Sequence, residues 1–364
     1  MTDYRKLAGP AICDIMPYKP GKPVKELERE LGIKEAIKLA SNENPFGPSP
    51  KVKAAIKEFF PELSRYPFGD AHDLRTKLAA KLEVPGDMLI FGTGSNEIIE
   101  LAIRTFVKDG EHVMSPAPSF SVYSSISQAA GKSCNWIPCK PDFSFDFDAL
   151  IGAINDKTRM IFFANPNNPT GVYTNDKDFS AFMERVPSDV IVVMDEAYVE
   201  FADAKDFPDT MKYLDKYKNI FIMRTFSKAY GIASLRVGYC VADAMAIDMM
   251  NRVRQPFNTN MAGQVAAVAA LEDQAYLQKV IRKNKKGRTY LQKEFKKLGL
   301  KFYPSQSNFI LVEVGDGEKV FNELLKKGVI VRFLGPSLGK YIRVSVGTMT
   351  ENEFFIEQLK KVLG

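Results

Sequence analysis

Between about residues 70 and 250, short apolar runs alternate with helical segments, and this alternation constrains the fold more than any other feature of the chain. Short apolar strands separated by helices predict a mostly parallel sheet, because parallel strands need crossover connections and are buried on both faces. We therefore expect an α/β fold with helices on both sides of the sheet. The expected strands are 88–91, 112–114, 160–164, 190–194, 220–223 and 238–242. The expected helices are 71–82, 96–107, 119–130 and 176–185.

The pattern changes toward both ends of the chain, whose 364 residues are enough for two domains. One short helix is expected at 24–31, and another begins after Ser49, a residue type that caps helix N-termini. Beyond about residue 250, helices are expected at 262–298, 317–327 and 351–363, and strands at 309–314 and 341–346. We expect an N-terminal arm with its short helix (1–40), a large domain (41–255) and a smaller α+β C-terminal domain (256–364).

Composition argues against several classes of function. The net charge is +6, and the lysines and arginines are scattered without interleaved aromatic residues, so we expect no nucleic-acid partner. Two histidines, His72 and His112, and four cysteines without metal-ligand spacing argue against a metal site and a Ser-His-Asp mechanism. The first residues are not an apolar leader, and no stretch approaches a membrane span. We therefore expect a cytoplasmic enzyme that binds no membrane.

Lys228 follows the apolar run 220–223, and this position suggests a buried amine. Burial disfavours the ammonium form and lowers the pKa of a lysine, which leaves a neutral amine that can form a Schiff base with a carbonyl compound. Ser227 precedes the lysine, and Arg236 lies eight residues after it. A hydroxyl and a guanidinium together can bind an anion, most simply a phosphate. These three residues suggest an aldehyde cofactor that carries a phosphate.

A glycine-containing turn precedes the helix expected at 96–107. Ser95 and Asn96 follow Gly92 and Gly94 at this turn, which is either a plain helix cap or a phosphate site, since backbone N–H groups at a helix N-terminus bind anions. The turn is not a dinucleotide-binding fingerprint, because Glu97 occupies the third glycine position.

Two more strands are followed by polar side chains at the carboxyl edge, where parallel sheets place ligand sites. Asn168 lies in NPNNPTG (165–171), which is either a rigid turn or a donor to a ligand oxygen. Asp195 is either a helix N-cap or the partner of a protonated aromatic nitrogen, which would make a cofactor ring a stronger electron sink. Tyr198, three residues further on, can hydrogen-bond a phenolic oxygen of the same ring.

An aromatic residue and two arginines complete the set of candidates. Phe120 opens a helix, where it either packs in the core or stacks on a planar cofactor. Arg343 lies within the strand expected at 341–346, and Arg332 follows the run 329–331. Each arginine is either exposed or forms a two-pronged contact with a carboxylate or phosphate.

Taken together, these motifs resemble the pyridoxal-phosphate-dependent aminotransferases of classes I and II over essentially the whole chain, and within them the histidinol-phosphate aminotransferases. The resemblance implies an aspartate-aminotransferase-like fold, with a seven-stranded-type sheet in the large pyridoxal-phosphate-binding domain. The motifs that carry it are KLASNENPFGPSP (38–50), RYP (65–67), NPNNPTG (165–171), DEAYVEF (195–201), TFSKAYGIASLRVGY (225–239), RQPFNTN (254–260) and IRVSVGT (342–348).

The resemblance also implies a role for each candidate residue. Lys228 would bind the pyridoxal phosphate covalently and shuttle the proton, and Asp195 would pair with the pyridine nitrogen. Tyr198 and Asn168 would bind the phenolate oxygen. The residues expected at the cofactor's phosphate are Ser95, Asn96, Ser227 and Arg236, joined by Tyr66 from the neighbouring subunit of a homodimer. The residues expected at the substrate's anionic end are Arg343, Arg332 and Tyr18.

The implied reaction moves an amino group between histidinol phosphate and 2-oxoglutarate, giving imidazole-acetol phosphate and glutamate, a step of histidine biosynthesis. An aromatic amino-acid aminotransferase is the alternative, followed by a pyridoxal-phosphate decarboxylase that acts on a phosphorylated amino acid. Two positions depart from the family pattern. Phe120 stands where tyrosine is often found, and Asn96 where aspartate is common. A stacked ring and a backbone contact survive these changes.

Overall fold

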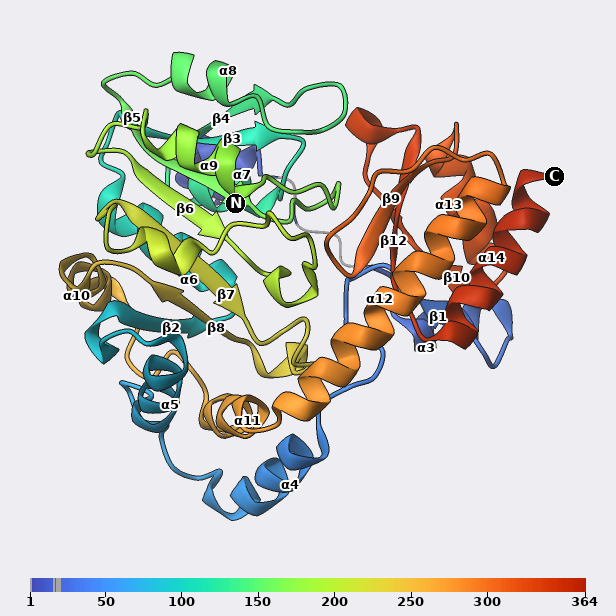
Figure 1. Cartoon of the computed structure of the whole chain (residues 1–364), viewed down its shortest axis with the longest axis horizontal. Helices are drawn as coiled ribbons and strands as arrows, with labels where there is room; N and C mark the ends of the chain where they lie inside the picture. Colours follow the sequence, from blue (N-terminus) through green and yellow to red (C-terminus); the bar gives the residue numbers. More distant parts are fainter. Residues whose placement is uncertain (1, 16, 18–20) are drawn as a thin grey trace.

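Seven strands form the main sheet, in the order β2-β8-β7-β6-β5-β3-β4 (Figure 1). The computed structural model describes residues 2–15, 17 and 21–364. Strand β8 runs antiparallel to β2 and to β7, and the other neighbours in the sheet are parallel, so the predicted mostly parallel sheet is confirmed. The strands are β2 (Leu89–Thr93), β3 (His112–Ala117), β4 (Ser133–Pro138), β5 (Thr158–Ala164), β6 (Ile191–Asp195), β7 (Ile220–Thr225) and β8 (Val237–Val241).

Each of the six predicted apolar runs overlaps one of these strands and extends at most one residue beyond it, and the seventh strand, β4, was not predicted. Strand β4 is at the edge of the sheet beside β3, and its residues alternate between exposed and half-buried. Ser133 and Asn135 are both polar and exposed, so this strand contains no continuous apolar run. An edge strand lacks the two-sided burial that makes a central parallel strand visible in a sequence.

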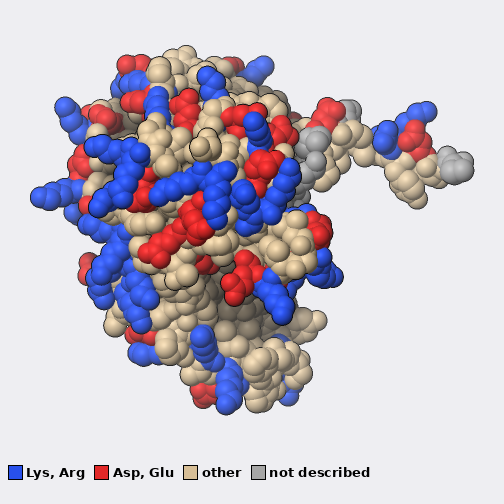
Figure 2. All heavy atoms as spheres, turned by 90° about the vertical axis from the view of Figure 1, so that its right-hand side faces the viewer, with Lys and Arg blue, Asp and Glu red and all other residues tan. Residues whose placement is uncertain are grey.

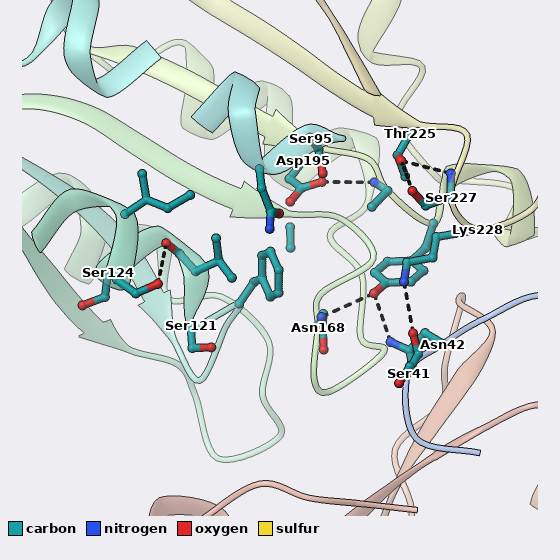
Figure 3. A pocket seen from close by; sticks show the side chains of 18 of the residues that line it. Ser41, Asn42, Ser95, Ser121, Ser124, Asn168, Asp195, Thr225, Ser227 and Lys228 are labelled. Carbon is teal, nitrogen blue, oxygen red and sulfur yellow. Dashed lines mark hydrogen bonds between the residues drawn. The ribbon is translucent and has the colours of Figure 1, made fainter. Parts of the chain in front are cut away.

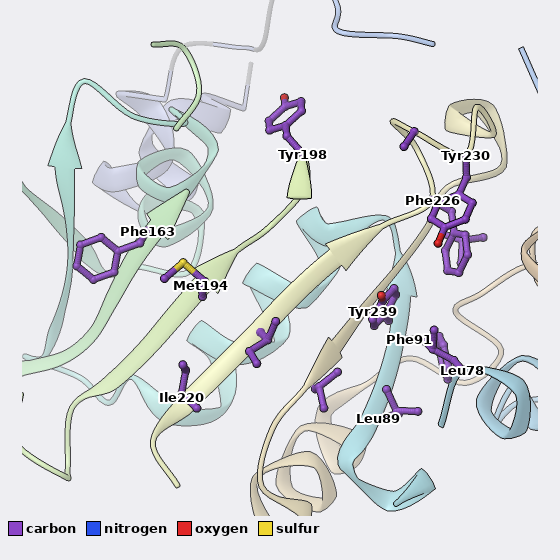
Figure 4. Close-up of a cluster of buried hydrophobic side chains, with 14 of the residues drawn as sticks. Leu78, Leu89, Phe91, Phe163, Met194, Tyr198, Ile220, Phe226, Tyr230 and Tyr239 are labelled. Atoms are coloured by element: carbon purple, nitrogen blue, oxygen red, sulfur yellow. The ribbon is translucent and has the colours of Figure 1, made fainter. Parts of the chain in front are cut away.

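Helices cover both faces of the main sheet because successive strand residues point to opposite sides. On β5, Phe163 packs in one core cluster with α5 and α9, whereas Phe162 packs in another with α6 and α10. Figure 4 shows part of the first cluster, including Phe163, Met194 and Ile220. The helices around this sheet are α4 (Pro50–Phe59), α5 (His72–Leu82), α6 (Ser95–Phe106), α7 (Val122–Ala129), α8 (Phe147–Gly152), α9 (Asp176–Met183), α10 (Ala244–Val253) and α11 (Met261–Leu271).

A second, three-stranded antiparallel sheet forms from the C-terminal part of the chain, in the order β11-β12-β9. Its core contains Phe295, Ile310, Val344 and Phe355, which join the sheet to the long helix α12 and to α14. The elements of this region are α12 (Gln274–Lys297), β9 (Phe309–Glu313), α13 (Gly317–Lys326), β10 (Val329–Ile330), β11 (Arg332–Phe333), β12 (Tyr341–Ser345) and α14 (Met349–Leu363). A separate small α+β region is thus present, as predicted.

Part of the N-terminal segment packs on this C-terminal region. Strand β1 (Ile37–Lys38) pairs in parallel with β10, and α3 (Val24–Leu31) buries Leu27 against Ala40 and Ile330 (Figure 1). Two short helices, α1 (Tyr4–Leu7) and α2 (Pro10–Cys13), precede it. After β1 the chain passes between this region and the main sheet, where Asn42 bonds both Ser345 of β12 and Tyr198, which follows β6. The domain boundaries at 40 and 255 stay predictions.

Charged side chains of both signs are interspersed on the face that carries the C-terminal region (Figure 2). Several of its lysines form exposed ion pairs within one helix, such as Lys361 with Glu357 and Lys326 with Glu323. Within the described ranges, no helix has the length and apolar character needed to cross a membrane.

Candidate active site

A cavity of about 1050 Å³ opens at the carboxyl edge of the main sheet, where the neighbouring parallel strands β5, β6 and β7 end. Because these strands are parallel, residues that follow them meet at one edge. Figure 3 shows the resulting convergence of side chains. The cavity brings together most of the predicted site residues, namely Ser95, Asn96, Phe120, Asn168, Asp195, Tyr198, Ser227, Lys228, Arg236 and Arg343.

Lys228 enters the cavity from the turn after β7. Its Nζ donates a hydrogen bond to the Ser41 carbonyl oxygen at 3.2 Å. Burial and, after it, the positive charge of Arg343 lower the pKa of Lys228 to about 8. About a tenth of this amine is therefore neutral at pH 7, far more than for a lysine of ordinary pKa, and the neutral form is the nucleophile.

Asp195 is the last residue of β6, and its side chain is buried. Tyr123 of α7 donates a hydrogen bond to Oδ2 at 2.7 Å, and the Ala197 backbone N–H donates to Oδ1 at 3.2 Å. Burial raises the pKa of Asp195 to about 6, although both hydrogen bonds oppose this rise. The carboxylate is therefore mostly ionised at neutral pH, and it lines the cavity. Sequence reasoning missed Tyr123, which lies one helical turn after Phe120 and could be found only by knowing that α7 faces β6.

The orientation of the Asn168 amide follows from Arg343. Arg343 is buried on β12, and its Nη1 donates to Asn168 Oδ1 at 2.6 Å. A guanidinium can only donate, so Oδ1 must face Arg343 and Nδ2 is left to donate to the Tyr198 hydroxyl, at 3.3 Å. Arg343 also donates from Nη2 to the Ala40 carbonyl oxygen at 2.7 Å. The predicted exposed alternative for Arg343 is therefore wrong, because this side chain is only 9% exposed.

The turn before α6 faces Arg236 and leaves no room for a side chain at two glycines. A Cβ at Gly94 would lie 2.3 Å from Arg236 Nη2, and a Cβ at Gly238 would lie 2.4 Å from the Ser95 backbone nitrogen. Gly94 also has φ of 73°, a backbone conformation that favours glycine. Arg236 Nη1 donates to Ser227 Oγ at 3.4 Å. A helix N-terminus, a hydroxyl and a guanidinium thus converge on one point, and these are the groups that bind a phosphate.

Four further candidates occupy different places. Phe120 lines the cavity and meets the Tyr123 ring edge to face, with ring centroids 5.6 Å apart. Arg332 lies directly opposite Arg343 on the neighbouring strand β11. It is not among the residues that line the cavity. Tyr66 is 82% exposed and stacks on Phe257, away from the cavity of its own chain. Tyr18 lies outside the described residues.

The residues fit a flat aromatic ligand with an anionic group at one end and an aldehyde beside Lys228. The anionic group would meet Arg236 and the start of α6, a ring nitrogen would meet Asp195, and an oxygen on the ring would meet Tyr198. Among the residues that the structure describes, no group of three or more His, Cys, Asp or Glu side chains is placed to hold a metal ion.

Comparison with known proteins agrees with this geometry. Residues 34–359 match the family model for aminotransferase class I and II. Histidinol-phosphate aminotransferase 2 of Pseudomonas fluorescens is 44% identical over 365 residues, which is 99% of this chain and 98% of that protein. The solved histidinol-phosphate aminotransferase of Sinorhizobium meliloti in complex with pyridoxal-5'-phosphate has a TM-score of 0.89 and 28% identity, covering 97% of this chain and 96% of its own. A Thermus thermophilus aspartate aminotransferase double mutant shares the fold, with a TM-score of 0.84 at 21% identity, covering 98% of this chain and 99% of its own.

Proposed function

Because this chain belongs to the class I and II aminotransferase family, we propose that it is a pyridoxal-phosphate-dependent enzyme that transfers an amino group between histidinol phosphate and 2-oxoglutarate. The observation that carries the proposal is the convergence of Lys228, Asp195 and the anion-binding turn at Arg236 in one cavity. Relatives at 42–44% identity over nearly their full length bear the name histidinol-phosphate aminotransferase, which supports this substrate. The expected role in histidine biosynthesis and the cytoplasmic location are part of the proposal.

The described residues would hold pyridoxal phosphate in one orientation. Its phosphate would lie at Ser95, Asn96, Ser227 and Arg236, its ring nitrogen at Asp195, its phenolic oxygen at Asn168 and Tyr198, and one ring face against Phe120. When bound, this cofactor supplies an aldehyde for an amine and a ring that withdraws electrons from the bonds to the substrate's Cα. The protein must supply the positioning, the charge and the proton transfer.

Lys228 would bind the cofactor's aldehyde and later move the proton at the substrate's Cα, for which a neutral amine is required. Arg343 would bind the substrate's anionic end, which is a carboxylate in one half of the reaction and a phosphate in the other. A guanidinium binds both anions with two hydrogen bonds. Arg332, opposite Arg343 across β11 and β12, would add a second positive charge for the doubly charged phosphate.

A substrate panel tests the proposal against its rivals. We expect kcat/KM for histidinol phosphate to exceed that for phenylalanine or tyrosine by about 100-fold or more, because a substrate without the phosphate leaves the arginines unpaired. The inverse ratio would favour the aromatic amino-acid aminotransferase. Release of carbon dioxide without any need for 2-oxoglutarate would favour the decarboxylase.

We propose that the protein is a homodimer in which Tyr66 serves the partner's cofactor phosphate. The proposal is supported by a group of large apolar side chains around Tyr66 that are exposed to solvent. Monomeric proteins rarely expose apolar patches of this kind. The members of this group are Phe60, Leu63, Tyr66, Phe68 and Phe257. Replacing Tyr66 with phenylalanine should lower cofactor affinity by about 10- to 100-fold, the value of a hydrogen bond to a charged group. Sedimentation as a fully active monomer would contradict this proposal.

The lowered pKa of Lys228 predicts the pH dependence of cofactor capture. The rate at which apo-protein reacts with pyridoxal phosphate should rise about tenfold per pH unit and level off above pH about 8, because only the neutral amine reacts. Stopped-flow absorbance measures this rate. In Arg343→Gln the break should move to higher pH, since a positive charge that lowers the pKa of Lys228 is gone. A wild-type rate that still rises between pH 9 and 10 would contradict the expectation.

A further inference from the structure

Asn42 is a buried residue with a left-handed backbone, in the loop between β1 and α4. Its side chain is 1% exposed, and its φ is 55°. Asparagine adopts this conformation more readily than most residues other than glycine. The backbone conformation therefore favours glycine or asparagine at this position. Of these two residues, only asparagine has a side-chain amide.

The Asn42 amide connects Ser345 of β12 with Tyr198. Nδ2 donates to the Tyr198 hydroxyl at 3.0 Å, a bond drawn as a dashed line from Asn42 in Figure 3. Oδ1 accepts from the Ser345 hydroxyl at 3.0 Å. Ser345 Oγ accepts in turn from the Asn42 backbone N–H at 2.9 Å, and Asn308 Nδ2 donates to the Asn42 carbonyl oxygen at 3.0 Å. In this arrangement the Ser345 hydroxyl accepts from the backbone N–H and directs its own hydrogen to Oδ1, and Nδ2 faces Tyr198.

The Tyr198 hydroxyl thus accepts hydrogen bonds from two amides, those of Asn42 and Asn168. A hydroxyl has two acceptor positions and one hydrogen. With both acceptor positions taken, the hydroxyl can meet any third group only as a donor. A ligand oxygen without a hydrogen is therefore favoured at this place in the cavity.

The two amides differ in what orients them. Asn168 is oriented by Arg343, which under the proposed function also binds the substrate's anion. The Asn42 amide is oriented by Ser345, two residues further along β12, and the Asn42 backbone is held by Ser345 and Asn308. Neither Ser345 nor Asn308 is assigned to substrate. Asn42 can therefore keep its hydrogen bond to Tyr198 while Arg343 changes partner during the reaction.

We propose that Asn42 is a positioning residue that keeps the Tyr198 hydroxyl a hydrogen-bond donor toward the phenolic oxygen of the cofactor. The inference rests on the proposed function, because that function supplies the phenolic oxygen. It assigns to the SNENP segment a role in the site that the sequence alone did not indicate.

A double-mutant cycle with Tyr198→Phe tests the proposal. Asn42→Gly keeps the left-handed backbone and removes the amide, so it should lower kcat by about fivefold or more, with KM for histidinol phosphate changed by less than about threefold. In the Tyr198→Phe background the same substitution should change kcat by less than about twofold, because its target is absent. In a pH titration followed by the absorbance of the bound cofactor, the midpoint of Asn42→Gly should differ from that of the wild type. The midpoint of the double variant should equal that of Tyr198→Phe alone.

An equal loss of kcat in both backgrounds would overturn the proposal and indicate a merely structural role. If Asn42→Gly does not fold, Ser345→Ala replaces it in the same cycle, since it removes the group that orients the amide. Asn284→Gly is the matched control: this buried asparagine donates to the Ser307 carbonyl oxygen outside the cavity, so removing its amide should leave the absorbance midpoint unchanged. A wild-type protein that neither binds pyridoxal phosphate nor turns over would instead refute the proposed function.

Discussion

Replacing Lys228 with alanine is expected to lower kcat by about 10⁴-fold or more, the largest effect that we expect from any substitution in this chain. Under the proposed function, the variant loses the amine that would bind the cofactor's aldehyde and move the proton at Cα. No other lysine lines the described cavity, so none is placed to take over either task. Single-turnover kinetics with histidinol phosphate measure the loss, and the absorbance of the protein after dialysis shows whether the cofactor is still covalently bound.

Lys228→Arg is the matched control, because it keeps a positive charge but carries no amine that loses its proton near neutral pH. If charge alone mattered, the arginine variant would retain most of the activity. We expect it to be about as inactive as the alanine variant while binding the cofactor noncovalently. Full turnover in Lys228→Ala would contradict the proposed function as a whole.

The central part of the fold was predictable because its strands are buried on both faces. β5 to β8 are continuous apolar runs, and these runs differ from the helical segments between them in both length and periodicity. The edge strand β4 was not predictable, since its outer side is exposed. The pairing of β1 with β10 was not predictable either. Strands of two residues are too short to show a periodicity, and these two strands are far apart in the sequence.

That Lys228, Asp195 and Asn168 line one cavity was predictable, because each ends or follows a strand of the main sheet. The hydrogen-bond partners of these residues were not predictable where they belong to elements that lie near the cavity only in the folded protein. Tyr123 reaches Asp195 from α7, and Asn42 reaches Tyr198 from a loop about 150 residues earlier in the chain. Neither residue type nor spacing in the sequence indicates these contacts.

Replacing Asp195 with asparagine is expected to lower kcat by about 10³-fold and, at the same time, to stabilise the apo-protein. Under the proposed function, catalysis suffers because a neutral amide would not keep the cofactor's ring nitrogen protonated. Stability rises because the wild-type carboxylate is buried and its pKa is raised from 3.8 to about 6. A raised carboxyl pKa means that the folded protein loses stability as pH rises from about 4 to about 6, since the ionised form must then be buried.

The shift of about two pH units corresponds to about 3 kcal/mol, which is the most that Asp195→Asn can recover above pH about 6. Denaturant unfolding of both apo-proteins at pH 4 and pH 8 measures this difference, which should be near zero at the lower pH. Tyr123→Phe provides the opposite control, because removing the hydrogen bond to Oδ2 raises the pKa of Asp195 further and destabilises the apo-protein at pH 8. If the asparagine variant is less stable than wild type at pH 8, the hydrogen bonds of Asp195 fully compensate its buried charge. The apo-protein would then not be destabilised by this carboxylate, and the expectation would be wrong.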